Sequence, residues 1–409
     1  MVTTSAQTTT LTPARSVLAI RTGMAFDGER MIGPATILVD RGRIIDVDTT
    51  GAPPPEGATV FDAGAGACVL PGLIDAHVHL CLDASQSGVS GLAALGDASL
   101  LARMRGEAER TLRAGVTSVR DLGDRGYLAL TLRDEIAAGI VAGPTVVAAG
   151  PPITVRGGHF SDLGGAAEGR RALRAAVRER SRRGCEVVKV MASGGHLTPG
   201  SNPHLSQYTL DELRLVADEA HQLGLLAAAH AHGSGAIADA VDAGFDTIEH
   251  VTFFTEAGVR ADPRTIERIV QRQVVVSATL GMVEGKGGPP PAVAAHVGTI
   301  KANLSALHRA GARIVVGSDA GVGPAKPHGV LPHGVCALTE IGMTNAEALR
   351  AVTTVAADAC GLAGRKGRIV PGADADLIVV GGNPLSDIRA IHAVRAVLRS
   401  GMWLSASDS

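Results

Sequence analysis

The sequence predicts an α/β protein: a (β/α)8 TIM barrel with a small β-sandwich domain built from both ends of the chain. Three observations support this prediction. Short apolar runs end in polar residues, helical segments alternate with them, and β-rich stretches occupy both termini. With 409 residues, the chain is long enough for one large α/β domain and one smaller domain.

Strand and helix patterns alternate through the middle of the chain. The apolar runs typical of buried strands are residues 72–79, 116–121, 145–150, 186–191, 225–230, 246–250, 273–279 and 313–319. Segments between them carry apolar residues at helical spacing and end in glycine, a helix C-cap signal; they include 91–115, 167–184, 209–224 and 233–244. Eight such units in roughly 300 residues match the size of a barrel whose chemistry lies at the C-terminal strand ends. Neither a GxGxxG motif nor a P-loop lysine points to a doubly wound sheet.

The two ends of the chain share a different pattern. Near the N-terminus, the runs SVLAI, ATILVD, GRIIDV and TVFDA are separated by turn residues, and GRIVPGADADLIVVGG and AVRAVLRSGMWL have the same character near the C-terminus. Neither piece is large enough to be stable alone, so we expect 16–69 and 366–409 to pair into one β-sandwich, leaving 70–365 for the barrel. Residues 1–15 lack the apolar segment of a secretory signal and are expected to be a disordered leader.

The composition argues against several classes of function. A net charge of -2 and only 2% aromatic residues provide neither a basic field nor a stacking surface for nucleic acid, and no charge for membrane binding. No apolar run reaches transmembrane length. The five cysteines are scattered without CxxC spacing, which fits reduced thiols. We therefore expect a cytoplasmic homo-oligomer that acts on a small molecule, not on nucleic acid or a membrane.

Side chains that bind metals recur at the ends of the predicted strands. In LPGLIDAHVHL, His77 and His79 lie two residues apart and therefore point to the same face of a strand. The ends of the fourth, fifth, sixth and eighth runs carry Lys189, His230, His250 and Asp319. One strand-end histidine is usually structural, but barrel strand ends converge, so these six side chains can share one pocket. Imidazole and carboxylate ligands suit zinc or a similar divalent ion.

Lys189 is the unusual member of this set. Burial of an ammonium group in the apolar run EVVKVM is costly, so the position favours the neutral amine. A neutral amine can react with carbon dioxide to give a carbamate, which can bridge two metal ions. The alternative is a lysine that extends to the barrel mouth or pairs with an acid. Beside the other five residues, we favour the carbamate.

These motifs resemble those of the amidohydrolase superfamily of metal-dependent hydrolases over nearly the whole chain. The resemblance includes LPGLIDAHVHL, the lysine of the fourth strand, AHAHG, IEH, GSDAG, and the closing segments GRIVPGADADLIVV and GGNPL. In detail the chain is similar to the Xaa-Pro dipeptidase (prolidase)-like and ochratoxinase-like members. They share a KVMASGG-type strand, SQYT before a helix with DEL, and HG after the aspartate of the eighth strand.

The resemblance implies a binuclear site with two divalent ions, zinc being the first choice. His77 and His79 would bind one ion together with Asp319, and a second ion would bind to His230 and His250. Carboxylated Lys189 and a hydroxide would bridge the two ions. The bridging hydroxide would attack the amide bond of a dipeptide such as Xaa-Pro or of an N-acyl amino acid. Asp319 would then serve as general base and afterwards as general acid.

Four further residues have supporting roles in this prediction. His159, Tyr208 and His232 are candidates for substrate binding. His333 in LPHGV is a candidate for contacting the metal ligands without binding a metal itself. The alternatives are a position in a surface loop for His159 and a packing role for Tyr208. Arg120 ends the second strand without an assigned role. Other histidines are expected to be structural: His196, His204, His221 and His296.

Two alternative functions stay open at the level of the sequence. One is a mononuclear hydrolase or deaminase of a cyclic amide or amidine, similar to imidazolonepropionase, which would not need Lys189 as a bridge. The other is a catalytically inactive relative that serves as a scaffold or binding protein. Such proteins typically lose metal ligands, whereas all six positions are filled in this chain.

Overall fold

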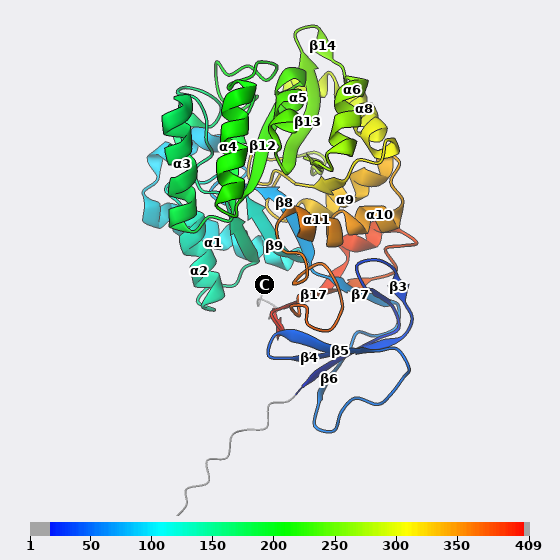
Figure 1. Ribbon diagram of the computed structural model, residues 1–409. Helices are drawn as coiled ribbons and strands as arrows, with labels where there is room; N and C mark the ends of the chain where they lie inside the picture. Colours follow the sequence, from blue (N-terminus) through cyan, green and yellow to red (C-terminus); the bar gives the residue numbers. More distant parts are fainter. Residues whose placement is uncertain (1–16, 405–409) are drawn as a thin grey trace, which may run out of the picture.

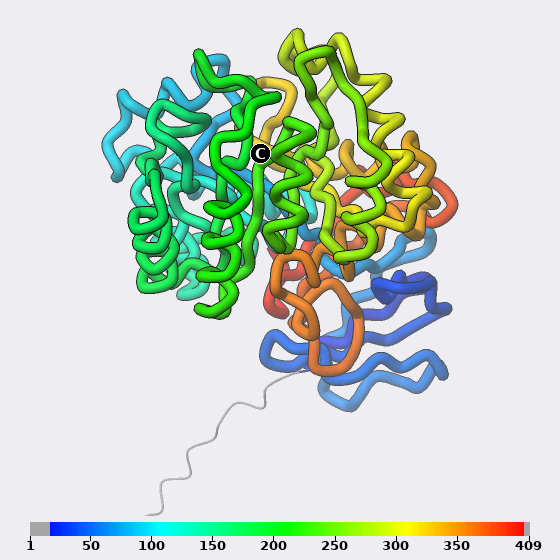
Figure 2. The backbone as a smooth tube through the Cα atoms, turned by 45° about the horizontal axis from the view of Figure 1, so that its top comes forward, coloured from blue at the N-terminus to red at the C-terminus, as the bar shows by residue number. Residues whose placement is uncertain are grey.

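The computed structural model describes residues 17–404, so the predicted leader at 1–15 lies outside the described residues. The chain has a TIM-barrel-like fold of mixed α/β content, with parallel strands surrounded by helices. Two smaller sheets, formed from both ends of the described chain, lie below this body (Figure 1). The tube in Figure 2 shows blue N-terminal and orange C-terminal segments side by side in that lower part.

The parallel strands overlap the predicted apolar runs. They are β8 (Leu73–Val78), β9 (Val116–Asp121), β10 (Thr145–Ala148), β11 (Val187–Met191), β12 (Leu226–Gly233), β13 (Thr247–Thr255), β15 (Val275–Ala278) and β16 (Ile314–Val316). They form two sheets, in the orders β10-β9-β8 and β11-β12-β13-β15-β16, and β14 (Gly258–Val259) pairs with the end of β13. Isolated parallel bridges, Val78 with Ala320 and Ile153 with Val190, connect the edges of the two sheets.

Helices follow most of these strands. They are α1 (Asp97–Arg113), α2 (Leu128–Ala137), α3 (Gly169–Arg183), α4 (Leu210–Gln222), α5 (Ser234–Ala243), α6 (Pro263–Gln271), α7 (Pro291–Ala294), α8 (Val297–Arg309), α9 (Leu331–Glu340), α10 (Asn345–Arg350) and α11 (Thr354–Ala359). α4 begins with a capping box between Thr209 and Glu212. α3 and α5 end at Gly184 and Gly244, whose φ angles of 86° and 87° favour glycine. None of the described helices is long and apolar enough to cross a membrane.

The terminal segments form two sheets, one from N-terminal strands alone and one from strands of both ends of the described chain. One contains β5 (Arg43–Asp48), β4 (Ala35–Asp40), β1 (Leu18–Thr22) and β6 (Thr59–Asp62). The other contains β19 (Met402–Trp403), β18 (Val394–Arg399), β17 (Leu377–Gly381), β7 (Ala67–Pro71), β2 (Ala25–Phe26) and β3 (Met31–Ile32). Ile378 of β17 pairs with Leu70 of β7 in antiparallel register, which joins the two ends of the described chain. Ile37 and Val379 belong to one hydrophobic cluster between the sheets.

Small and branched side chains fill the space between the parallel strands at their N-terminal ends. The cluster contains Ile74, Val147, Val187, Ala228, Val275 and Val315 from six strands, together with Ala356 and Ala357 of α11. These side chains are almost completely buried and pack against one another. The polar side chains that end the strands therefore gather at the opposite, C-terminal end.

Candidate metal centre

The two histidines of β8 and the aspartate after β16 form the first group of ligand-type side chains. His77 and His79 are 1% and 2% exposed, and their Nε2 atoms lie 3.3 Å apart. Asp319 Oδ1 lies 3.6 Å from His77 Nε2 and 3.5 Å from His79 Nε2. The ligand atoms of all three residues lie within 4.8 Å of one another, a spacing that a single metal ion can bridge.

A second group comes from β12 and β13, which continue beyond His230 and His250 to Gly233 and Thr255, and it contains three histidines. His230, His232 and His250 are buried, and one nitrogen of each lies within 4.8 Å of the others. The ring of His250 lies 4.5 Å from the rings of both His230 and His232, and 5.3 Å from the ring of His77. The two groups are therefore adjacent. The structure also brings His232 into this group, although the sequence suggested a substrate contact.

Lys189 of β11 is completely buried, and its Nζ has no hydrogen-bond partner among the described residues. Burial is the main cause that lowers the pKa of this amine to about 8; Arg120 lowers it further, whereas Glu249 and Asp319 raise it. The positive charge of Lys189 in turn lowers the pKa of His77 and of His250, so the amine lies close to both groups. An unpartnered buried amine of lowered pKa has the properties that carbamate formation requires.

The outer nitrogens of the buried imidazoles are held by hydrogen bonds. His79 Nδ1 lies 3.0 Å from the Gly123 carbonyl oxygen, and His230 Nε2 lies 3.1 Å from that of Gly194. Because a carbonyl oxygen only accepts, each of these nitrogens carries the proton and leaves the other nitrogen free as a ligand. Burial lowers the pKa of His79 to about 3, with a further contribution from the charge of His77. The imidazoles are therefore held in the neutral form that binds metals.

Asp319 and His250 share an unusual backbone conformation. Their φ angles are 58° and 73°, in the left-handed region that non-glycine residues rarely adopt. Burial raises the pKa of the Asp319 carboxyl, but the charges of His77, His79 and Lys326 outweigh it and lower the pKa. Lys326 Nζ donates to the carbonyl oxygens of Ser318 and Thr279 at 2.7 and 3.0 Å. These two hydrogen bonds connect the segments that follow β15 and β16.

Glu249 is a functional candidate that the sequence reasoning missed. It is completely buried; its Oε2 lies 3.0 Å from His77 Nδ1 and its Oε1 lies 2.9 Å from Arg120 Nη2. Alternation along a strand places Glu249 and His250 on opposite faces, so only one of them was expected at the site. The positive φ of His250 breaks that alternation and lets both serve it. The acidic residue in DTIEH is the only feature of the sequence that could have indicated the contact between Glu249 and His77.

The supporting residues predicted from the sequence occupy different places. His159 is 3% exposed and its ring lies 4.6 Å from the ring of His230, so the structure brings it to the site. Tyr208 is buried before α4, and its hydroxyl donates to the Ala167 carbonyl oxygen at 2.8 Å. His333 lies on α9 with its ring 4.6 Å from the ring of His392. Among the described residues, no hydrogen bond or ring contact joins Tyr208 or His333 to the two groups, and their roles stay predictions.

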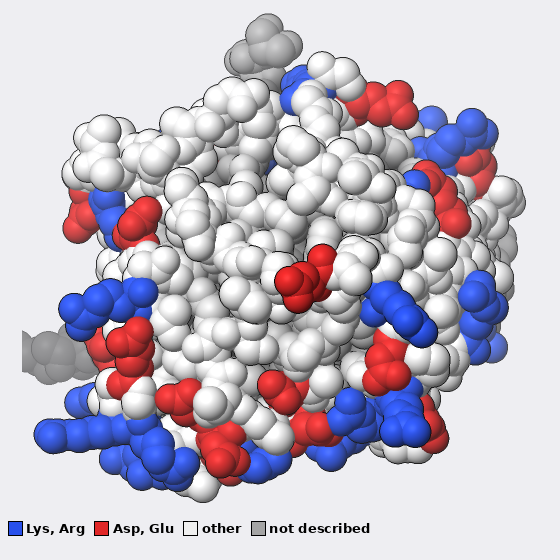
Figure 3. Space-filling model, turned by 90° about the horizontal axis from the view of Figure 1, so that it is seen from above, with Lys and Arg blue, Asp and Glu red and all other residues white. Residues whose placement is uncertain are grey.

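Two histidines that were expected to be structural extend the ring cluster. The ring of His196 lies 5.0 Å from the ring of His232 and 5.2 Å from that of Phe254, and the ring of His296 lies 5.9 Å from Phe254. Loops bring these residues to the strand ends, which periodicity along the sequence does not reveal. Figure 3 looks down on this side of the molecule, where β13 continues into β14; most charged side chains lie around its edge.

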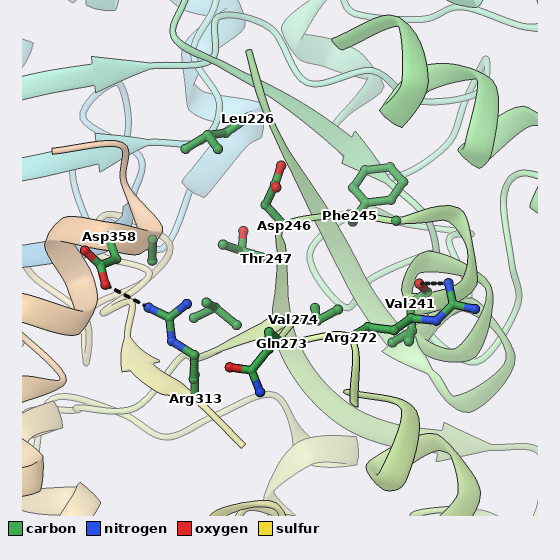
Figure 4. A pocket seen from close by; sticks show the side chains of 13 residues that line it. Leu226, Val241, Phe245, Asp246, Thr247, Arg272, Gln273, Val274, Arg313 and Asp358 are labelled. Atoms are coloured by element: carbon green, nitrogen blue, oxygen red, sulfur yellow. Dashed lines mark hydrogen bonds and ion pairs between the residues drawn. The ribbon is translucent and has the colours of Figure 1, made fainter. Parts of the chain in front are cut away.

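A hollow at the other end of the strands is distinct from this site. It encloses about 230 Å³ and is lined by residues at the starts of β12, β13 and β15, by residues between α6 and β15, and by Arg313 and Asp358 (Figure 4). Arg313 and Asp358 form an ion pair of 3.0 Å across its edge. None of the candidate ligands lines this hollow.

Comparisons with known proteins identify a family and several similar hydrolases. Residues 68–404 match the model of the amidohydrolase family. Ochratoxinase from Aspergillus niger is 30% identical over 366 residues, which cover 80% of this chain and 73% of that protein. A crystal structure of a Xaa-Pro dipeptidase with methionine bound in its active site is 27% identical, with a TM-score of 0.85 over 96% of this chain and 100% of that one. A prolidase complexed with N-methylphosphonate-L-proline is 29% identical, with a TM-score of 0.83 over the same shares.

A family match over most of the chain, together with hydrolases among the similar proteins, is decisive for the class of this protein. His77, Lys189, His230 and His250 lie in parallel strands, and His79 and Asp319 follow β8 and β16. The chain belongs to the amidohydrolase family and is a hydrolase that acts on C–N bonds.

Proposed function

We propose that this protein hydrolyses the amide bond of a dipeptide such as Xaa-Pro, or of an N-acyl amino acid, at a site for two divalent metal ions. The observation that supports this most directly is the pair of adjacent ligand groups beside the unpartnered amine of Lys189. The similar proteins add support, because they include a Xaa-Pro dipeptidase, a prolidase and an ochratoxinase.

The proposal includes a closed barrel over 70–365 and a β-sandwich of 16–69 with 366–409. The bridges from Val78 to Ala320 and from Ile153 to Val190 support closure, because they connect the edges of the two parallel sheets. The hydrophobic cluster shared by the two terminal sheets supports the sandwich. In a closed barrel the C-terminal strand ends converge on one face, which is why residues far apart in sequence reach one site.

The donor set fits two ions, for which zinc is the first choice. His77, His79 and Asp319 would hold one ion, and His230 and His250 the other, with the carbamate of Lys189 between them. The carbamate forms when the neutral amine nitrogen bonds to the carbon of carbon dioxide and releases a proton. Two ions held there would supply the acidity that activates water near neutral pH and polarises the scissile carbonyl.

Asp319 is the proposed proton carrier, and His232 and His159 the proposed substrate contacts. The lowered pKa of Asp319 keeps its carboxylate free to accept a proton from the attacking water. The same group then delivers that proton to the leaving nitrogen, which would otherwise depart as an unstable amide anion. His232 stacks on His250 at 4.5 Å and His159 lies beside His230, so both border the place where the amide would bind.

The first prediction concerns the number of metal ions. Elemental analysis of purified protein, loaded with divalent ions and then freed of excess, should find close to two ions per chain. The reason is that each group contains three ligand-type side chains, and the carbamate of Lys189 would supply the bridge between the two ions. A fully active protein with a single ion would contradict the binuclear proposal and favour a mononuclear enzyme similar to imidazolonepropionase.

The second prediction concerns the leaving group. If the substrate is a dipeptide or an N-acyl amino acid, the enzyme should recognise its free carboxylate through hydrogen-bond donors such as His159 or His232. Capping that carboxylate as an amide should lower kcat/KM by about 10-fold or more, because each lost charge-assisted hydrogen bond is worth 1.5–3 kcal/mol. A matched pair that differs only at the N-terminal amine is the control. Equal rates for free and capped substrates would contradict recognition of the carboxylate.

A further inference from the structure

A buried chain of three charged or titratable side chains runs from the middle of the barrel to the first ligand group. Arg120 of β9 contacts Glu249 of β13, which contacts His77 of β8, at 2.9 and 3.0 Å. Arg120 and Glu249 are completely buried, and His77 is 1% exposed. These three contacting side chains therefore link three strands behind the place where a metal would bind.

Every polar atom of the arginine–glutamate pair is engaged. Arg120 Nε donates to the Ala76 carbonyl oxygen at 2.7 Å, and Nη1 donates to Thr247 Oγ1 at 3.1 Å and to the Ala359 carbonyl oxygen at 3.3 Å. Thr247 Oγ1 in turn donates to Glu249 Oε1 at 2.8 Å. A buried ion pair is retained at low cost only when its remaining donors and acceptors are satisfied. Here Glu249 Oε1 is fixed by two donors, which directs Oε2 towards His77.

We propose that Glu249, held by Arg120, is a positioning residue for His77, an inference that rests on the proposed binuclear function. By accepting the Nδ1 proton, Glu249 selects one tautomer of the imidazole and aims the lone pair of Nε2 at the metal. The same arrangement affects Lys189. Both oxygens of Glu249 accept from other donors, and Lys189 Nζ has no hydrogen-bond partner among the described residues.

The chemistry of an amide at this position gives a sharp test. In Glu249→Gln, the amide has one oxygen and one NH2 group in place of two oxygens. If the oxygen accepts from His77 Nδ1, the NH2 group faces the guanidinium of Arg120, and both groups are donors. If the amide turns over, two donors oppose each other at His77 instead. One contact is lost in either case. Chelator competition on the metal-loaded protein should show that one of the two ions binds about 10- to 100-fold more weakly while the other is unchanged, as for other carboxylates that orient a metal ligand.

A double variant distinguishes positioning from simple structural support. In Arg120→Met with Glu249→Gln, the opposing donor is gone, so the amide is free to turn its oxygen to His77. The double variant should therefore bind the weakened ion more tightly than Glu249→Gln alone. Thr247→Val removes one donor that fixes Glu249 and should weaken the same ion to a smaller degree, which provides a milder variant if Glu249→Gln fails to fold. Thr111→Val, at a buried threonine of α1 that bonds only to the Glu107 carbonyl oxygen, is the matched control.

The outcomes separate this inference from the proposed function. If the unaltered protein binds fewer than two ions, the binuclear proposal fails before the variants are considered. If it binds two, and Glu249→Gln and Thr247→Val lower the melting temperature but bind both ions with unaltered affinity, the pair is structural and the positioning role is wrong. Equal loss of both ions, without recovery in the double variant, would overturn it as well.

Discussion

Lys189→Ala is expected to abolish turnover and to leave less than one ion per chain tightly bound. The substitution removes the side chain proposed to bridge the two metals, while both histidine groups stay in place. Hydrolysis of a dipeptide or an N-acyl amino acid should fall by orders of magnitude, because the metal-activated nucleophile is lost. Folding should persist, because Lys189 makes no hydrogen bond whose partner would be stranded.

Chemical rescue makes this prediction specific to a carbamate. Truncation leaves a space of the right kind for a short carboxylic acid, whose two oxygens imitate those of a carbamate. Acetate or propionate, added with divalent metal, should therefore restore part of the activity of Lys189→Ala and raise its metal content. Lys366→Ala, at a buried lysine paired with Asp374 and Asp376 near the terminal sheets, is the control and should not respond to added acid.

The dependence on carbon dioxide gives a second readout. The pKa of about 8 means that much of the amine is neutral at mildly alkaline pH, whereas an exposed lysine is almost fully charged there. Metal-free protein should regain activity faster when metal is added with bicarbonate, and faster as the pH rises towards and above 8. Reactivation at the same rate in carbon dioxide-free buffer would rule out the carbamate.

Asp319→Asn is expected to lower kcat by about 100- to 10,000-fold, the contribution typical of a general acid–base group. An amide is similar in shape but does not take up the proton of the attacking water, so the loss should fall on kcat rather than on folding. Circular dichroism should be unaltered, and elemental analysis should still find metal at the histidines. Near-normal turnover would remove Asp319 from the mechanism.

A matched aspartate controls for the loss of a charge. Asp246 lies just before β13, at the opposite end of the strands, and accepts hydrogen bonds from His221 and from the backbone nitrogen of Ala227 at 2.9 and 2.7 Å. Asp246→Asn should lower the free energy of unfolding by about 1 kcal/mol and leave kcat unaltered. If both variants lose turnover equally, the effect of Asp319→Asn would reflect general damage to the fold.

Much of the fold and the first ligand group follows from local patterns in the sequence. Residues two apart in a strand point the same way, so the HxH spacing was sufficient to place His77 and His79 together. The alternation of strands and helices likewise predicted the parallel strands that carry Lys189, His230 and His250. These inferences hold because a few consecutive residues determine whether a segment is a strand or a helix and to which face each side chain points.

The features that the sequence did not reveal depend on the backbone or on distant contacts. Glu249 lies on the same face of β13 as Thr247, and the left-handed backbone at His250 brings the neighbouring imidazole to the same site, which no residue type in the sequence indicates. His196 reaches the ring cluster through a loop, and the Tyr208 hydroxyl is engaged by a carbonyl oxygen 41 residues away in sequence. Contacts of this kind depend on how the βα loops fold, which local sequence patterns do not determine.

The pairing of β7 with β17 has a consequence for how the chain folds during synthesis. β7 ends at Pro71, and its partner strand begins only at Leu377, so the ribosome must release the entire central region before that edge is covered. Until then Val69 and Leu70, which are fully buried in the finished protein, belong to an unpaired apolar edge. Nascent chains should therefore depend on rapid collapse of the central region, or on a chaperone, to escape aggregation.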